Sequence, residues 1–172
     1  MKTRMVAAVV LCLITVAAFG QVNPKVKELH SFVGTWQCKG ITFASPMGPE
    51  HPTKATVHGM WILGGAWLQI TYTEMKTPKN PQPYAVQAVW SYDEQPKAFV
   101  AGAVDNMGGY STQQSPGWDG DKLVFTGPMH GGGATMKSRD IFTRVSKTEI
   151  RHESEIEMDG KWTKLDQETC KK

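Results

Sequence analysis

The chain has 172 residues, with 19 lysines and arginines against 16 aspartates and glutamates, so its formal net charge at neutral pH is +3. Lys2 and Arg4 belong to an N-terminal segment that we expect to be removed, which leaves 17 basic against 16 acidic residues. This balance excludes a basic surface for nucleic acid or for an anionic membrane. The remaining length suits one domain with a hydrophobic core of its own.

Residues 1–20 have the organisation of a secretory signal peptide. A basic start precedes an apolar run, and small residues stand at the positions that a signal peptidase requires for cleavage between Gly20 and Gln21. The apolar run is shorter than the ~20 residues that a membrane-spanning helix needs. The sequence therefore predicts an exported protein, periplasmic or extracellular, with no stable membrane insertion and a single domain over residues 21–172.

A short amphipathic segment opens this domain, followed by a series of strand-like runs. Residues 24–32 begin with Pro24 and place Val26, Leu29 and Phe32 on one face, which predicts one or two helical turns. The rest of the chain divides into runs rich in β-branched and aromatic residues, separated by turn signals such as Asp-Gly and Gly-Gly. Ten runs are predicted as strands, over residues 35–43, 54–62, 66–75, 84–92, 97–105, 110–115, 122–127, 135–145, 149–158 and 162–170.

The spacing of these runs predicts an all-β fold. The connections are short and none has the helix that a parallel βαβ unit needs, so we expect an antiparallel, up-and-down sheet of about ten strands. A sheet of this size exposes two edges unless it closes, which favours a closed or nearly closed barrel. The motif Gly34-Thr35-Trp36 resembles the element that opens the first strand of lipocalin-type barrels, where the glycine permits a sharp turn and the indole plugs one end.

Cys38 and Cys170 are the two cysteines of the predicted mature chain. In an oxidising compartment an even pair favours a disulfide, and here it would join the first and last strands along the seam of the barrel. Two free thiols or a metal pair stay open as alternatives. Side chains alternate along a strand, so an inward Trp36 places Cys38 inside as well. On the last strand, Cys170 shares a polar face with Lys164, Asp166 and Glu168, and this face is expected to point outward.

Five short motifs resemble those of a known family. They are Phe32-Val33-Gly34-Thr35-Trp36, Trp61-Ile62-Leu63-Gly64-Gly65-Ala66-Trp67-Leu68, Tyr92-Asp93-Glu94, Trp118-Asp119-Gly120-Asp121-Lys122-Leu123 and Asp159-Gly160-Lys161-Trp162. Over nearly the whole mature chain they are similar to the bacterial exported family catalogued as domain of unknown function 1579. The resemblance implies a calycin-like barrel, related in shape to lipocalins and fatty-acid-binding proteins, and it supplies no activity and no catalytic residue. A lipocalin-like barrel also implies that Arg139 or Arg144 stacks over Trp36.

His152 is the candidate for binding a cofactor. In the run 149–158 alternate residues are charged, and the other face carries His152 among apolar and small residues, so its imidazole is expected to point inside. Nitrobindin-type barrels, which resemble this chain in strand number and in the Gly-x-Trp motif, hold haem through a histidine. An inward His152, with His130 nearby, could bind haem or a metal, and the alternative is a hydrogen-bonded core histidine.

Alternating apolar residues give a candidate ligand site inside the barrel, where one face of every strand points. The same residues could instead fill the interior. The run 110–115 is polar on both faces, however, and inward polar groups need water or a ligand to bond, so we expect a wet or occupied interior. The predicted ligand-binding residues are Trp36, Leu68, Ile70, Tyr72, Trp90 and His152.

No complete catalytic arrangement is recognisable in the sequence. The loop His130-Gly131-Gly132-Gly133 matches the oxyanion-hole loop of lipases, but the Gly-x-Ser-x-Gly nucleophile elbow that must accompany it is missing. We therefore expect an exported, monomeric barrel that binds a small apolar or amphipathic molecule without catalysis. Two alternatives stay open: a haem- or metal-binding barrel that uses an inward histidine, and a structural or partner-binding envelope protein with a solid interior.

Overall fold

The computed structural model describes residues 22–45 and 48–172, so the predicted signal peptide and its cleavage site before Gln21 lie outside the described residues. Within these ranges no helix is long and apolar enough to cross a membrane. The elements are the 3-10 helices η1 (Pro24–Phe32) and η2 (Leu63–Gly65) and the strands β1 (Gly34–Thr42), β2 (His51–Ile62), β3 (Trp67–Glu74), β4 (Ala85–Asp93), β5 (Ala98–Asp105), β6 (Tyr110–Ser115), β7 (Trp118–Asp119), β8 (Lys122–Gly131), β9 (Ala134–Ser146), β10 (Glu149–Met158) and β11 (Lys161–Lys171).

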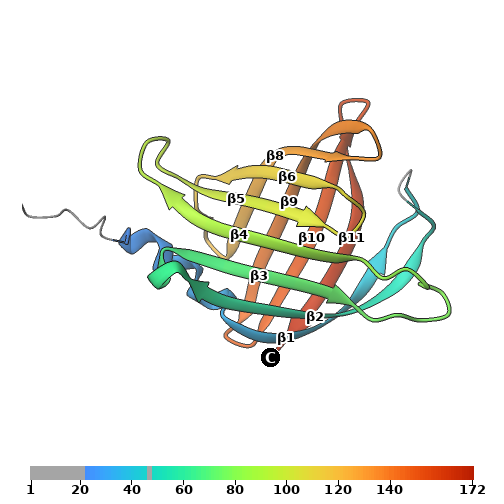
Figure 1. Cartoon of the computed structure of the whole chain (residues 1–172), viewed down its shortest axis with the longest axis horizontal. Helices are drawn as coiled ribbons and strands as arrows, with labels where there is room; N and C mark the ends of the chain where they lie inside the picture. The colour runs from blue at the N-terminus through green and yellow to red at the C-terminus, as the bar shows by residue number, and fades with distance from the viewer. Residues whose placement is uncertain (1–21, 46–47) are drawn as a thin grey trace, which may run out of the picture.

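The strands form one closed antiparallel barrel (Figure 1). Their order is β6-β5-β4-β3-β2-β1-β11-β10-β9-β8-β7, and an additional pairing between β6 and β8 closes the ring. The ring therefore contains ten strands, with β7 as a two-residue extra strand attached to β8. The predicted up-and-down barrel of about ten strands, with a helical turn at its N-terminus, is confirmed.

Strand β8 is longer than predicted, because the turn that ends it lies further along the chain. Gly132 and Gly133 have φ angles of 58° and 79°, and they form a two-residue hairpin turn between the paired residues Gly131 and Ala134. Glycine adopts this left-handed backbone without steric cost. His130 is consequently part of a strand and not of a loop.

A β-bulge interrupts the pairing of β10 with β11 between Ser154 and Glu155, and the residue left without a partner is Leu165 of β11. The alternation of β10 itself continues, because its pairing with β9 does not shift there and Ile156, which was predicted to lie inside, is 0% exposed. Glu155, which was predicted to be wet, is 7% exposed, and Met158, which was predicted to lie inside, is 37% exposed. Glu155 pairs with Arg139, which lies over Trp162. The prediction for this strand is therefore wrong for Glu155 and Met158 and right for Ile156.

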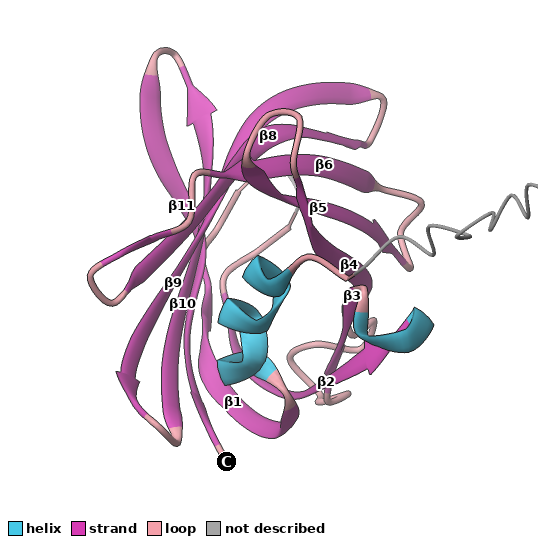
Figure 2. Ribbon diagram, turned by 90° about the vertical axis from the view of Figure 1, so that its left-hand side faces the viewer, coloured by secondary structure: helices cyan, strands magenta, loops and turns pink. Residues whose placement is uncertain are grey.

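Helix η1 covers one end of the barrel (Figure 2). Val26, Leu29 and Phe32 on its inner face are buried, as the amphipathic pattern predicts. The indole Nε1 of Trp36 donates a hydrogen bond to the carbonyl oxygen of Phe32 at 3.1 Å. Gly59 faces the same carbonyl so closely that an added Cβ would lie 2.2 Å from it, so only glycine lets the helix approach the wall.

The cation over Trp36 is a lysine and not an arginine. Lys172 Nζ lies 4.6 Å from the Trp36 ring, whereas Arg144 lies over Trp118 and Arg139 over Trp162. The predicted arginine is wrong because β9, which carries both arginines, is separated from β1 by β10 and β11. The C-terminal end of β11, by contrast, is paired directly with β1.

The seam between β1 and β11 joins the two ends of the barrel domain. Cys38 and Cys170 are directly opposite one another there and form a disulfide across 132 residues of sequence. Both cysteines point inward, and Glu168 on the same face of β11 is 3% exposed. The prediction that Cys170, Asp166 and Glu168 face outward is therefore wrong: this polar face of β11 lines the barrel interior.

Gly40 makes room for Glu168 at this seam. A Cβ at Gly40 would lie 2.0 Å from the carbonyl oxygen of Gln167 and 2.7 Å from Glu168 Cγ. These distances are far below van der Waals contact, so any side chain here must displace β11 or expel the glutamate.

We predict that Gly40→Ala lowers the free energy of unfolding by about 2 kcal/mol or more, because it overpacks the seam. Gly102→Ala on β5 is the matched control, since a Cβ there meets nothing within 4 Å. That change should alter stability by less than about 1 kcal/mol. Urea unfolding followed by tryptophan fluorescence measures both, and equal stabilities for the two variants would contradict the close approach at Gly40.

Candidate functional site

The barrel interior is divided into an apolar floor next to η1 and a polar half beyond it. The floor is a packed cluster of aromatic and aliphatic side chains in which Phe32 contacts the rings of Trp90, Trp118 and Phe142 at 4.9 to 5.9 Å between centroids. Four of the residues predicted to bind ligand belong to this floor and are at most 9% exposed, namely Trp36, Leu68, Ile70 and Trp90. They can form the base of a site but line little open space themselves.

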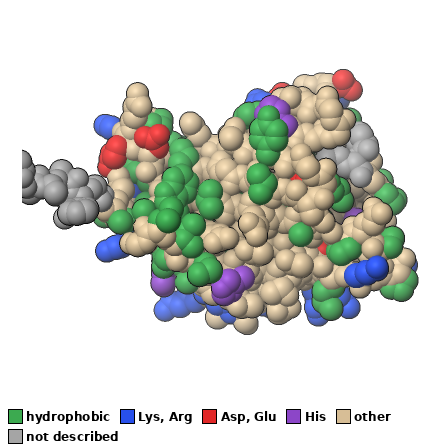
Figure 3. Space-filling model, viewed as in Figure 1, with side chains coloured by type: hydrophobic (Ala, Val, Ile, Leu, Met, Phe, Trp, Pro, Cys, Tyr) green, Lys and Arg blue, Asp and Glu red, His purple; other side chains and the backbone are tan. Residues whose placement is uncertain are grey.

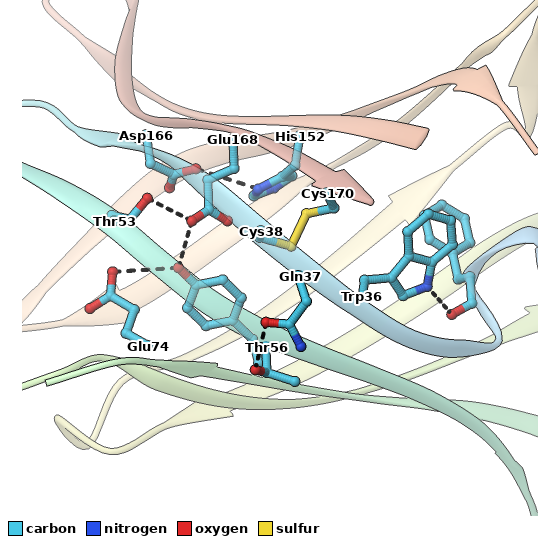
Figure 4. Close-up of a disulfide and its surroundings, with 12 residues drawn as sticks. Trp36, Gln37, Cys38, Thr53, Thr56, Glu74, His152, Asp166, Glu168 and Cys170 are labelled. Atoms are coloured by element: carbon cyan, nitrogen blue, oxygen red, sulfur yellow. Dashed lines mark hydrogen bonds and ion pairs between the residues drawn. A yellow bond between two sulfur atoms is a disulfide. The ribbon is translucent and has the colours of Figure 1, made fainter. Parts of the chain in front are cut away.

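The polar half lies on the other side of the disulfide (Figure 4). Trp36 is found on one side of the Cys38–Cys170 bond, and Glu74, Asp166 and Glu168 are found on the other. These carboxylates come from β3 and β11, and β9 and β10 add Asp140 and His152. His152 was predicted from the sequence, whereas all four acidic residues were missed. The one signal that could have identified two of them was the shared face of Cys170, Glu168 and Asp166, if the disulfide had been assumed.

His152 is held between two carboxylates. Its Nε2 lies 3.0 Å from Asp140 Oδ1 and its Nδ1 lies 3.4 Å from Asp166 Oδ1. The ring stacks on Phe142 with 4.7 Å between centroids. Asp140 is positioned in turn by Gln113, whose Nε2 donates to Asp140 Oδ2 at 2.7 Å. Both ring nitrogens of His152 therefore face acidic partners.

The electrostatics of this group favour an imidazolium. Burial alone lowers the pKa of His152, but the hydrogen bond to Asp140 and the charges of Asp166, Asp140 and Glu168 outweigh burial and raise the pKa to about 9. For Asp166, burial and the neighbouring charges of Asp140, Glu168 and Glu74 outweigh His152 and raise the pKa to about 7. At neutral pH His152 is thus positively charged, with Nε2 hydrogen-bonded to Asp140 and Nδ1 close to Asp166 without a hydrogen bond between them.

A protonated imidazole is unsuited to holding haem or a metal, because ligation needs a neutral ring nitrogen with a free lone pair. His130 does not assist, since it lies on the outer face of β8, where its ring stacks on that of the half-exposed Tyr110 at 4.3 Å. The prediction that His130 lies near His152 is wrong. The geometry supports the hydrogen-bonded interior histidine that the sequence left open as the alternative.

Glu168, Tyr72 and Glu74 form a second network beside this group. Glu168 Oε1 accepts hydrogen bonds from Thr53 Oγ1 at 2.7 Å and from Tyr72 OH at 3.0 Å. Glu74 Oε2 accepts from Asn80 Nδ2 at 2.6 Å and from a backbone N–H at 2.9 Å. Burial, with the charges of Glu168 and Glu74, raises the pKa of Tyr72, so its phenol remains a donor. Tyr72 is the one predicted aromatic ligand residue that reaches the polar half.

Inward-facing side chains of the polar half retain solvent-accessible surface. His152, Asp140 and Asp166 are 20%, 27% and 28% exposed, although all three point into a closed ring of strands. Ala103 is also only partly buried. In a filled barrel these groups would be as inaccessible as the floor. A molecule the size of water can therefore reach the interior above the floor.

A separate groove of about 510 Å³ lies on the outer wall. Its lining includes Trp67, Val89 and Val100, which point away from the interior because they alternate with buried residues on β3, β4 and β5. Figure 3 views this side of the molecule, where hydrophobic side chains lie among neutral ones. The groove competes with the open interior as a place for an apolar ligand.

The described residues contain no convergent set of metal ligands. In the ranges 22–45 and 48–172, the one group of three potential ligand atoms within 4.8 Å of one another is formed by Cys38, Glu168 and Cys170. The two sulfurs are bonded to each other and cannot bind a metal.

Fold and interior together define a lipocalin-like barrel with a polar, partly open interior. The model of the protein family of unknown function DUF1579 matches residues 22–172, and the chain belongs to this family. The crystal structure of Rv2717c from M. tuberculosis is similar in fold, with a TM-score of 0.63 and 10% sequence identity over 88% of this chain and 99% of that one. The crystal structure of a DUF3598-family protein of unknown function from Nostoc punctiforme aligns with 87% of this chain and 99% of its own at 8% sequence identity. Its TM-score of 0.26 is too low to indicate a shared fold. No curated protein matches the chain.

We predict that the stability of the protein falls as the pH rises from about 7 to about 9, because the folded state holds a proton on His152 that the unfolded chain releases near 6.5. The stabilisation is fully present below the unfolded pKa and is lost as the pH passes the folded pKa. Its size is at most about 3 kcal/mol. Urea unfolding at a series of pH values measures the slope.

His152→Gln should remove this slope, and His130→Gln on the outer face should keep it. An unchanged pH dependence in His152→Gln would show that the imidazole is not held as a cation between Asp140 and Asp166.

Proposed function

We propose that the protein is an exported binding barrel that holds a small amphipathic molecule in the open half of its interior. The observation that carries this proposal is the accessible surface left on inward-facing side chains of a closed barrel. The apolar part of the ligand would rest on the aromatic floor, and its polar part would meet the carboxylates and the phenol of Tyr72 above it.

The buried disulfide supports an oxidising compartment, as an exported protein requires. The state of His152 supports binding without catalysis. General-base chemistry needs a free, unprotonated nitrogen within reach of a substrate, whereas Nε2 and Nδ1 both face carboxylates. Among the described residues, no serine or cysteine is paired with this histidine as an activated nucleophile would be.

We predict that the neutral fluorescent probe N-phenyl-1-naphthylamine binds the wild-type protein and that Ala103→Phe abolishes binding. Ala103 is an inward-facing residue on β5, so a phenyl group there fills the open half. Val100→Phe is the matched control, because Val100 lies on the same strand but lines the outer groove. The change in probe fluorescence on titration gives the affinity, and circular dichroism verifies that both variants are folded.

Loss of binding in Val100→Phe with retention in Ala103→Phe would move the site to the outer groove. If the wild-type protein binds no probe at all, the interior is not a ligand site. The structural or partner-binding role that the sequence leaves open would then be the better account.

A further inference from the structure

The open half of the interior carries an excess of negative charge. Glu74, Asp140, Asp166 and Glu168 lie close enough that the other three charges help to raise the pKa of Asp166. His152 is the positively charged group that faces them at neutral pH, with a pKa raised by the same carboxylates. Above the pKa of Asp166, which is about 7, four acidic groups share one imidazolium, so the potential inside the chamber attracts cations and repels anions.

Two buried polar atoms in this region have no hydrogen-bond partner. Asp166 Oδ1 makes no hydrogen bond, and its nearest cationic neighbour is His152 Nδ1 at 3.4 Å. Nε2 of His51 is likewise unbonded and lies 3.9 Å from Glu74 Oε1. The other three carboxylates accept hydrogen bonds of 3.0 Å or shorter. An unsatisfied carboxylate oxygen is costly, and a positively charged donor is the partner that would satisfy it best.

The carboxylates are too far apart for a bare metal ion. In the part of the chain that the structure describes, no three of their oxygens and the imidazole nitrogens come within 4.8 Å of one another. A larger cation does not need such convergence. The chamber also presents aromatic surface, from Phe142 beside His152 and from Tyr72 beside Glu168, and aromatic faces attract organic cations.

We infer that the ligand of the interior site is an organic cation, a protonated amine carried on an apolar or aromatic body. The ammonium group meets Asp166 and its neighbouring carboxylates, and the body rests against Phe142 and the floor. Anionic amphiphiles such as fatty acids are excluded by charge. This inference rests on the proposed function and names the class of ligand.

The test compares two probes with the same ring and opposite charge, tryptamine and indole-3-propionate, by isothermal titration calorimetry at about pH 8, between the pKa values of Asp166 and His152. Tryptamine should bind at least about 10-fold more tightly. Asp166→Asn, which removes the charge of the side chain without changing its shape, should weaken the binding of tryptamine by about 10-fold or more. Asp119→Asn, on the exposed strand β7 at the outer surface, is the matched control and should leave both affinities unchanged.

Equal affinities, or tighter binding of indole-3-propionate, would overturn the inference and leave the interior site itself standing. The inference is overturned in the same way if neither indole binds while N-phenyl-1-naphthylamine does. If no probe binds, the proposed function fails and the inference fails with it. If Asp166→Asn does not fold, the comparison of tryptamine with indole-3-propionate on the wild-type protein tests the inference by itself.

Discussion

Closure of the sheet between β6 and β8 is the constraint on which the rest of the structure depends, because only a closed ring gives every strand an inner face. The two strands approach so closely that a Cβ at Gly127 would lie 2.1 Å from the carbonyl oxygen of Thr112. At the opposite side of the ring the Cys38–Cys170 disulfide fixes β1 against β11. Carboxylates in the enclosed space are only partly accessible to water, so their charges act on one another and on His152 more strongly than at a surface.

The interior separates two kinds of chemistry along the barrel axis. Near η1, aromatic and aliphatic side chains exclude water and supply the stabilising burial that a domain of this size needs. Beyond the disulfide, side chains from β3, β9, β10 and β11 form hydrogen-bonded polar networks that fix their geometry. A buried polar network is tolerated only when its members are nearly all satisfied. The few that are not satisfied, Asp166 above all, are where a ligand would contribute most.

The sequence predicts the architecture well because strand rhythm and turn glycines are local signals. All ten long strands, the N-terminal helical turn and the inward position of His152 follow from alternation and turn chemistry. The acidic residues of the interior cannot be predicted in this way, because the same alternation assigns charged residues to the outer face of the barrel. Glu168 is accommodated by Gly40 across the seam and by donors 96 and 115 residues away in sequence, Tyr72 and Thr53. Such long-range satisfaction of a buried charge is invisible in a single sequence.

The central claim is that His152 is a cation clamped between two carboxylates inside a water-accessible chamber. Nitrogen-15 NMR of the imidazole ring tests it most directly, because the two ring nitrogens report their protons separately. The account predicts that both nitrogens of His152 carry protons at neutral pH and that the ring loses one only near pH 9. The account would be contradicted if one ring nitrogen of His152 carried no proton at neutral pH and the imidazole titrated at its usual pKa.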